Sequence, residues 1–522
     1  MKNNRFVLWF LIPILMFAIA GAFAMNMTAF WYDEHMYITA SVFVAQGKEL
    51  YKDFAYLQTP YLPFLYGSLY RILGIESYYF FIGKLLSFLF LITSSVVLFL
   101  LARRVLHDLF LSLGIVTLFL LNINILNSAA LATNFMMPAA LSIISFYLFY
   151  ISFIENQIKL VGITFAGIFL ALAIGTKFTY ATAVIPFVMI IICYLAMEKY
   201  SYINIKKNSI YSLLFYIAGL TVGLLPILFF ISDFDSFSFN NLGFHNVNAH
   251  WRQITDFDGP MSLYAKLAFA HKQYFKSDTL ILLLGIMLAA GLSIKSSQTM
   301  RQAIQQIHSG AFLTFFLVLI TAITALIPTP SWPHYYSIPI GFLFILFVFS
   351  CVSDSEKTSI LHKRLVFILI FVTAAYNGPH LLWNISRLAH KETWIALRSH
   401  DVSTNVQNVL IENGIATDRK IATLSPIYAI ESNLPTYSEL STGPFLFRVG
   451  DLLSPEQRKH FVGTSAKSLD DLFAEDPPAA ILVDYEGGDL VDLNKPFIAY
   501  ATINNYKKVY VAGLNGEFYV KP

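Results

Sequence analysis

The stretch Trp31-Tyr32-Asp33-Glu34-His35 directly follows a long apolar run from Phe6 to Phe30. As a helix, a run of this length can cross about 30 Å of bilayer hydrocarbon. Aromatic residues are common where such a helix leaves the membrane, but two adjacent carboxylates are not. Charged groups at the membrane are costly unless they have partners or a function. Asp33 and Glu34 are therefore the first candidates for a functional site.

The composition is that of a polytopic membrane protein. Of the 522 residues, 57% are hydrophobic and 13% are charged, whereas soluble proteins carry about 25% charged residues. The net charge of +3 is too small to indicate nucleic acid as a partner. Cys193 and Cys351 lie in apolar runs, so we expect no disulfide framework. Lys2 and Arg5 resemble the start of a signal sequence, but no convincing cleavage site follows, and we interpret the first run as an uncleaved span.

Eleven apolar runs are long enough to span a membrane. They begin near Phe6, Tyr79, Leu109, Met136, Leu160, Phe178, Ile210, Thr279, Phe312, Ser337 and Leu365. The pair between Leu160 and Met197 is either two short spans or one element broken at Gly175-Thr176-Lys177. Lysine and arginine cluster in alternate short loops, which places these loops and the N-terminus in the cytoplasm. The loops 31–78 and 232–277 and everything after Trp383 then face outward from the cell (inner) membrane.

After residue 383 the sequence changes from long apolar runs to a mixed, polar composition, which predicts two domains. Residues 1–383 form an α-helical polytopic membrane domain, and residues 384–522 form a small outward-facing α/β domain. In the second domain, Asp401 to Asn413 predicts a helix that ends at Gly414. The stretches 420–424, 479–483 and 508–511 predict short strands. Asn515-Gly516 predicts a turn between strands.

The first outer loop predicts two further helices. Apolar residues recur at helical spacing from Glu34 to Ala45, and this pattern ends at Gly47. A second amphipathic stretch runs from Tyr61 to Leu73. Such helices tend to lie in the plane of the membrane surface. They would hold the two carboxylates at the height of the lipid head groups.

This loop resembles the first outer loop of the C-type glycosyltransferases, in the branches related to protein O-mannosyltransferases and lipid A aminoarabinose transferases. In that family an acidic residue follows the first span, and a Gly-x-x-x-Tyr-x-Asp stretch leads to a proline-rich stretch. The matching residues are Asp33-Glu34, Gly47-Lys48-Glu49-Leu50-Tyr51-Lys52-Asp53 and Thr59-Pro60-Tyr61-Leu62-Pro63. Weaker matches follow at Gly83-Lys84-Leu85-Leu86-Ser87, where the family usually has an arginine, at Gly175-Thr176-Lys177-Phe178-Thr179, and at His334-Tyr335-Tyr336 with Pro339. The resemblance covers essentially the whole membrane part.

The resemblance implies a transfer of sugar from a polyprenyl-phosphate carrier to a lipid, glycan or protein acceptor at the outer membrane face. The family's catalytic acid corresponds to Asp33, which would accept the proton of the attacking hydroxyl, with Glu34 beside it. One base and direct displacement at C1 predict inversion. The leaving phosphate needs fixed positive charge and hydrogen-bond donors. The candidates at predicted outer ends of spans or in outer loops are Lys84, Lys177, Arg252 and His334.

A metal site is not supported by the spacing of ligands. The family commonly has a second acidic residue after the third span, where this chain has Asn134. His245 and His250 are close in sequence, but they lack zinc-type spacing, and we interpret them as loop histidines. We therefore predict no metal ligands, although a divalent metal cofactor stays open.

Two structural alternatives and three other functions stay open at this stage, one of them a structural or assembly protein. Lys84 and Lys177 could simply extend their charged ends to the membrane surface. A transporter or flippase of lipid-linked sugars would place charged pairs within its spans and would show inverted repeats. A ligase that moves an assembled glycan is a closer alternative. The acidic pair after the first span favours the transferase.

Overall fold

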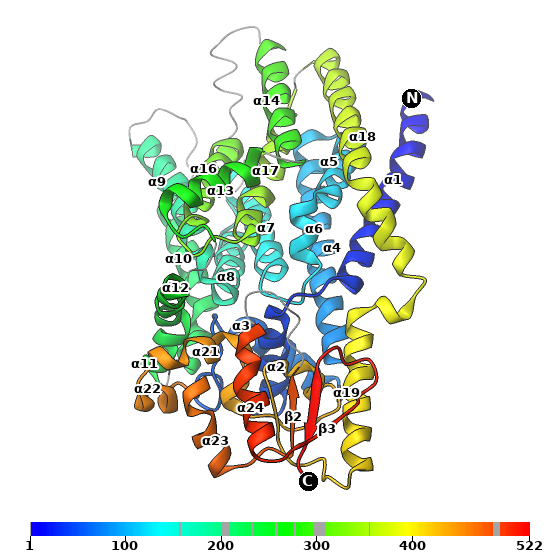
Figure 1. The fold of residues 1–522 in the computed structure, drawn as a ribbon. Coiled ribbons are helices and arrows are strands. Elements are labelled where there is room, and N and C mark those ends of the chain that lie inside the picture. The colour runs from blue at the N-terminus through cyan, green and yellow to red at the C-terminus, as the bar shows by residue number, and fades with distance from the viewer. Residues whose placement is uncertain are drawn as a thin grey trace.

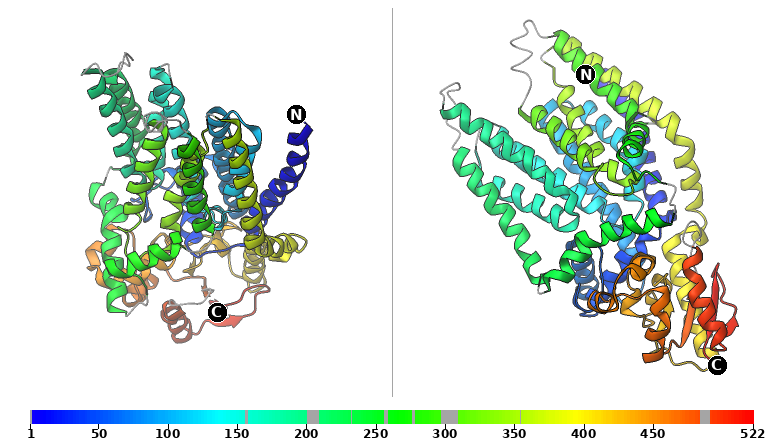
Figure 2. Two further views of the ribbon diagram at one scale, coloured as in Figure 1. Left: turned by 90° about the horizontal axis from the view of Figure 1, so that it is seen from above. Right: turned by 60° about the vertical axis from the view of Figure 1, so that its left-hand side comes forward.

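In the computed structural model, a bundle of long helices forms most of the molecule, and a small sheet with its own helices lies at one end (Figure 1). The N-terminus lies at the opposite end, as the right-hand view of Figure 2 also shows. The structure describes residues 2–155, 158–199, 209–231, 233–255, 259–275, 278–296, 309–353, 355–483 and 491–522.

Among these residues, eight helical segments are long and apolar enough to cross a membrane. They are α1 (Lys2–Thr28), α4 (Tyr79–Leu106), α7 with η1 (Met136–Phe149, Tyr150–Ile154), η2 with α9 (Phe178–Ala183, Val184–Lys199), α10 with η3 (Ser209–Leu224, Leu225–Phe230), α14 (Asp278–Ser296), η5 with α17 (Pro333–Tyr336, Ser337–Ser350) and α18 (Glu356–Arg387). The bent pair α5 (Leu109–Leu121) and α6 (Ile123–Ala129) makes a ninth when counted as one span, and α8 (Leu160–Thr176) and α16 (Ser309–Thr324) are shorter apolar helices. Each of the eleven predicted spans coincides with one of these segments. The protein is thus an α-helical, multi-pass integral membrane protein.

Charged loop residues gather in ion pairs at the ends of several spans. Arg104, in the last turn of α4, lies 2.6 Å from Glu155, which follows η1. Lys363, in α18, lies 2.6 Å from Asp108, whose side chain also caps the start of α5. These contacts join loops that the charge pattern assigns to one side of the membrane. The assignment of that side to the cytoplasm remains a prediction.

The first outer loop forms both predicted helices. They are α2 (Asp33–Ala45) and α3 (Tyr61–Ile72), which pack against each other. The helix α2 is buried from Glu34 to Phe43, so protein surrounds it on nearly all sides. It therefore does not rest on a membrane surface with one polar face in water, because the bundle and the C-terminal part enclose it.

The C-terminal part carries a four-stranded sheet in the order β1-β2-β4-β3. The strands β1 (Ile421–Thr423) and β2 (Ala480–Val483) are parallel, and β4 (Glu517–Val520) is antiparallel to both β2 and β3 (Lys507–Val509). Beside them, α19 (Ile395–Glu412) ends just before Gly414, which has a φ of +71°. The predicted small α/β element near the C-terminus is therefore confirmed. The division after residue 383 remains a prediction, and α18 itself extends to Arg387.

Specific contacts attach the C-terminal part to the membrane bundle. Oε1 of the buried Glu431, just after α20 (Ile427–Ile430), accepts a hydrogen bond from the Phe80 backbone N–H at 2.6 Å, at the start of α4. Further along, the ring of Phe461 stacks on Phe239 with centroids 3.9 Å apart. Phe239 begins η4 (Phe239–Gly243), which follows α11 (Phe234–Ser238) and precedes α12 (Phe244–Ile254). In the same region α21 (Pro444–Val449) packs against α12.

Candidate active site

A cavity of about 690 Å³ lies where the first loop, the bundle and the C-terminal part meet. Its wall comes from segments far apart in the sequence, at residues 31–37, 57–59, 124–135, 177–179, 241–252, 327–335 and 445–448. Four of the six predicted site residues line it, namely Asp33, Lys177, Arg252 and His334. Glu34 and Lys84 do not. The fold therefore brings together one predicted base and three predicted phosphate ligands.

Asp33 is the first residue of α2 and faces this cavity. A helix N-terminus favours a negative charge, but the surrounding protein has the larger effect. Burial raises the pKa of Asp33 to about 6, against the opposing positive charge of Arg448, Lys177 and Arg252. The negative charge of Glu34 adds to the increase. At neutral pH the carboxylate is mostly ionised, yet its affinity for a proton is higher than that of an ordinary aspartate.

Lys177 lies at the junction between α8 and η2, where the chain turns between two helices. Its Nζ atom is 4.1 Å from the ring centroid of Phe135 and 5.4 Å from that of Tyr335. Burial lowers the pKa of Lys177 to about 7, although the charge of Asp33 acts in the opposite direction. His334 stacks on the same Phe135 ring, with centroids 4.3 Å apart. Two of the weaker sequence motifs thus meet at one aromatic ring.

A glycine explains part of the motif that contains Lys177. A Cβ atom on Gly175 would lie 2.2 Å from ring atoms of Tyr61, in the proline-rich stretch of the first loop. The hydroxyl of Tyr61 donates to the Gly223 carbonyl at 2.6 Å. Only glycine allows this close approach, so α3 can pack against the end of α8 beside the cavity.

Arg252 reaches the cavity from the last turn of α12 and is buried. Its Cζ atom lies 5.7 Å from the ring of Trp251 and 5.6 Å from that of Trp332. Arg448, from α21, lies 5.4 Å from the same Trp251 ring. Two buried guanidinium groups are therefore close to one indole, and Lys177 adds a third cation to the wall. Such a wall favours an anionic ligand.

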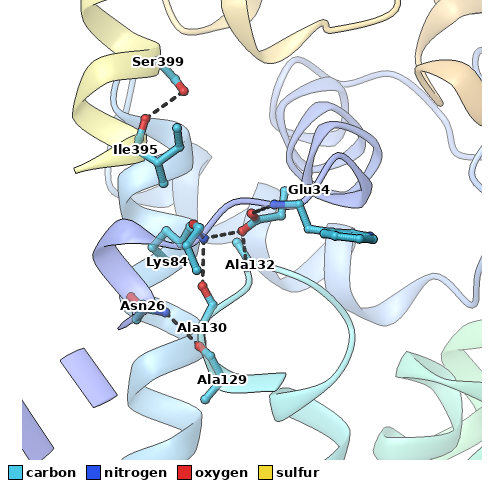
Figure 3. A network of polar contacts seen from close by, with 10 residues as sticks. Asn26, Glu34, Lys84, Ala129, Ala130, Ala132, Ile395 and Ser399 are labelled. Atoms are coloured by element: carbon cyan, nitrogen blue, oxygen red, sulfur yellow. Dashed lines mark hydrogen bonds and ion pairs between the residues drawn. The ribbon is translucent and has the colours of Figure 1, made fainter. Parts of the chain in front are cut away.

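Glu34 and Lys84 form a separate, fully enclosed network (Figure 3). Lys84 Nζ lies 2.7 Å from Glu34 Oε1, and it also donates to the carbonyl oxygens of Ala29 and Ala130 at 2.7 and 2.8 Å. The carboxylate of Glu34 accepts from the backbone N–H groups of Ala132 and Trp31 at 2.6 and 3.0 Å. The three donors of Lys84 therefore all have partners within the protein. The buried position of Lys84 supports a role in holding the start of α2. Its ammonium group has no access to a phosphate in the cavity.

Arg448 is a candidate that the sequence did not indicate. It lies in the C-terminal part, outside every motif. Its Nε and Nη2 atoms donate to Asn248 Oδ1 at 3.0 and 2.6 Å. One signal was present: Arg448 is a single cation within the otherwise apolar stretch 443–450. An isolated charge in such a stretch indicates a buried functional or structural role.

Asn134 lies at the position where the resemblance described above would place a second acid, and it lines the cavity. Its Oδ1 atom accepts from the Tyr37 hydroxyl at 2.9 Å, and its Nδ2 atom donates to Gln58 Oε1 at 3.0 Å. In the part of the chain that the structure describes, no three His, Cys, Asp or Glu residues are grouped to hold a metal ion. Burial lowers the pKa of the cavity-lining His245 to about 4, so this histidine is neutral near pH 7.

No protein-family model and no curated protein matches the sequence. The fold does match solved structures. ArnT from Cupriavidus metallidurans bound to undecaprenyl phosphate gives a TM-score of 0.61 at 11% identity, over 98% of this chain and 97% of that one. ArnT from the same organism in the apo state gives 0.60 at 12% identity, over 99% and 98%. The archaeal oligosaccharyltransferase AglB from Archaeoglobus fulgidus, in complex with an inhibitory peptide and a dolichol-phosphate, gives 0.45 at 10% identity, over 91% and 69%.

The similarity to ArnT extends over the helix bundle and the C-terminal part together. At 11–12% identity it is evidence for the fold. The first loop, the bundle and the sheet described above are all included in the matched length. The chain is therefore a polytopic membrane protein with the C-type glycosyltransferase fold, similar to ArnT over nearly the full length of both chains.

Proposed function

We propose that this protein is a membrane glycosyltransferase that moves a sugar from a polyprenyl-phosphate carrier to a lipid, glycan or protein acceptor. The active site would face outward from the cell (inner) membrane. The observation that carries the proposal is the common cavity of Asp33, Lys177, Arg252 and His334. A base and an anion site side by side are what sugar transfer from a phosphate requires.

Asp33 would act as the general base. The acceptor hydroxyl attacks C1 of the sugar, the bond from C1 to the phosphate oxygen breaks, and the hydroxyl proton passes to the Asp33 carboxylate. Burial raises the pKa of Asp33 to about 6, which keeps the group ionised at neutral pH and makes it a stronger base than a solvated aspartate.

Lys177 and Arg252 would hold the carrier phosphate, with His334 beside them as a hydrogen-bond partner, since Lys177 and His334 both contact the Phe135 ring. The bridging phosphate of the donor carries one negative charge, and the released monoester carries up to two. Fixed cations therefore stabilise the leaving group more strongly as the bond breaks. Because these cations are buried, water weakens their interaction with an anion less than it would at the surface. The structure of ArnT bound to undecaprenyl phosphate supports the choice of carrier.

Inversion at C1 is the expected stereochemical outcome. Retention through a covalent sugar intermediate uses a second carboxylate as the nucleophile. Among the described residues that line the cavity, Asp33 is the acidic one and no second carboxylate accompanies it. A single displacement with one base is therefore the mechanism that we propose.

The test is a transfer assay with purified protein and a panel of undecaprenyl-phosphate sugars, read as release of undecaprenyl phosphate. Asp33→Asn should lower turnover by about 10²–10⁴-fold, the usual loss for a general base, while undecaprenyl phosphate still binds. Asp418→Asn, at an exposed position of the C-terminal part, is the matched control and should leave turnover unchanged. Nuclear magnetic resonance of the product would show whether the anomeric configuration is inverted. Normal turnover by the Asp33→Asn protein would refute the assignment of the base.

A further inference from the structure

A series of side-chain hydrogen bonds follows the cavity wall beside Asp33. Tyr37 lies four residues after Asp33 in α2, one turn further on the same face of the helix, and both residues line the cavity. The hydroxyl of Tyr37 donates to Asn134 Oδ1 at 2.9 Å, and Asn134 Nδ2 donates to Gln58 Oε1 at 3.0 Å. Asn134 and Gln58 also line the cavity. The series therefore connects two uncharged amides to the helix that carries the proposed base.

The contacts of Asn134 determine the orientation of its amide. The backbone carbonyl oxygen of Thr176 lies 3.4 Å from Nδ2, and a carbonyl oxygen can only accept. The nitrogen of Asn134 must therefore face Thr176, which leaves Oδ1 for the Tyr37 hydroxyl. Asn134 is 1% exposed. Both donors of its amide thus have acceptors within the protein, one of them on Gln58.

The bond from Asn134 also determines the orientation of the Gln58 amide. Because Oε1 of Gln58 accepts this bond, Nε2 lies on the other side of the amide. Gln58 is half-buried, and Nε2 has no protein partner among the residues that the structure describes. The Tyr51 hydroxyl donates to the Gln58 backbone carbonyl at 2.5 Å, which holds the main chain at this position. Gln58 therefore offers two N–H donors from a fixed place in the cavity wall.

The charged side chains of the wall determine which sugars suit this cavity. Among the described residues that line it, Asp33 is the acidic one, whereas Lys177, Arg252 and Arg448 are basic. An ammonium group on a bound sugar would find no carboxylate other than the proposed base. Burying an ammonium group without a counter-ion is costly. A sugar hydroxyl can accept a hydrogen bond from N–H donors such as those of Gln58, but an ammonium group cannot.

We propose that the cavity binds a neutral, hydroxyl-bearing sugar in preference to an amino sugar, and that Gln58 is a specificity-determining residue that donates to a sugar oxygen. Asn134 is its positioning residue, because it determines the orientation of the Gln58 amide. An aspartate at position 134 would have acceptors only. The Gln58 amide would then turn to donate to it and would present Oε1, an acceptor, to the cavity. The inference rests on the function proposed above and adds the class of sugar.

The experiment compares carrier-linked sugars that differ in a single group, using the full-length protein in detergent at pH 7. The two pairs are undecaprenyl-phosphate glucose with undecaprenyl-phosphate glucosamine, and undecaprenyl-phosphate arabinose with its 4-amino-4-deoxy counterpart. Dissociation constants from titration calorimetry give the preference within each pair. The unmodified protein should bind the neutral member about tenfold or more tightly. Equal binding of both members, or tighter binding of the amino sugar, would overturn the proposal.

Four variants test the roles of the two amides. Asn134→Asp should reduce the preference about tenfold or reverse it, because the Gln58 amide turns and a carboxylate is added. Gln58→Glu places a carboxylate oxygen at the cavity directly and should have the same effect even if Asn134→Asp does not fold. Gln58→Met, of similar size but without donors, should weaken binding of the neutral members only. Asn127→Asp is the matched control, because Asn127 is an exposed amide in the same wall, and it should shift the preference much less.

Two results with these variants would overturn the proposal. An unchanged preference in both Asn134→Asp and Gln58→Glu would show that neither amide selects the sugar. A shift in Asn127→Asp as large as that in Asn134→Asp would show that added negative charge alone is responsible. Undecaprenyl phosphate without a sugar provides a further check, because Gln58→Met should bind it as tightly as the unmodified protein does. A loss equal to that for the neutral sugars would make Gln58 a phosphate ligand and would also overturn the proposal.

Turnover of the same compounds separates this inference from the function on which it rests. If the amino sugars bind more tightly and are transferred, the inference fails and the transferase proposal stands. If the neutral sugars bind selectively but are not transferred, the transferase proposal fails and the preference for neutral sugars stands. A protein that binds none of the four compounds contradicts both.

Discussion

Lys84 Nζ and Glu34 Oε1 lie 2.7 Å apart, and neither side chain is exposed at all. This contact separates the roles of two adjacent acids. Successive helical residues point about 100° apart, so Asp33 faces the cavity while Glu34 points into the protein against α4. The acidic pair after the first span is therefore one candidate catalytic group and one structural group.

Breaking this pair should destabilise the protein strongly. Lys84→Met leaves the Glu34 carboxylate buried without its cation, which typically costs about 3–5 kcal/mol. The unfolding temperature in detergent should fall clearly. The double variant Glu34→Gln with Lys84→Met should lose less stability than the sum of the two single variants, because neither charge then remains unpaired.

A surface pair provides the control for that experiment. Lys52 and Glu49 are also in contact at 2.8 Å, but their side chains are 61% and 63% exposed. Exposed pairs contribute about 0–1 kcal/mol, so Lys52→Met should hardly change the unfolding temperature. Equal effects at Lys52 and Lys84 would contradict the buried network.

The fall of kcat/KM at low pH should reflect protonation of Asp33. Since burial raises the pKa of this carboxyl to about 6, the basic form is lost as the pH falls through 6. The ratio kcat/KM should then drop about tenfold per pH unit below that value. A pH profile from 4.5 to 8 measures this, and an acid limb near pH 4, the range of a solvated aspartate, would show that Asp33 is not the group that titrates.

The affinity for the carrier phosphate should decrease at higher pH because of Lys177. Burial lowers the pKa of this lysine to about 7, so it is charged below that pH and neutral above it. Binding of undecaprenyl phosphate should weaken between pH 7 and 9. Lys177→Arg should remove this decrease, because arginine remains protonated throughout the range. The same pH dependence in both proteins would mean that another group causes it.

The orientation of the chain is testable with reporter fusions. The distribution of lysine and arginine predicts that residues near Arg104 lie in the cytoplasm and that residues near Asn413 lie outside. Alkaline phosphatase should be active after Asn413 and inactive after Arg104. The reverse pattern would place Asp33 on the cytoplasmic side and contradict an outward-facing active site.

Local patterns in the sequence predicted most of the helices. The length of an apolar run predicts a membrane span. A 3.6-residue period of apolar residues predicted α2 and α3 to within about one residue. The sequence also supplied Asp33, Lys177, Arg252 and His334, but it gave no sign that they share one cavity, because the cavity depends on contacts between distant segments.

Two features of the site could not be predicted from the sequence, for different reasons. Lys84 looks like an accessible cation near the end of a span, and only the three-dimensional structure shows that three protein oxygens use all its donors. Arg448 lies in no motif, and its place in the cavity wall depends on the docking of α21 against α12. The spacing of residues along the sequence does not show which buried charges form pairs, because the same residue type occurs both with and without a partner.

The bond from Phe80 to Glu431 has a consequence for how the chain matures. The two residues are 351 positions apart, and a ribosome adds about 5–20 residues per second. The start of α4 is therefore synthesised roughly 20–70 s before the carboxylate that caps it. Arg448 follows later still. During synthesis the cavity exists without one of its walls, so a chain interrupted before this point carries Asp33 but no complete site. The wall of the cavity is complete only when translation is nearly finished.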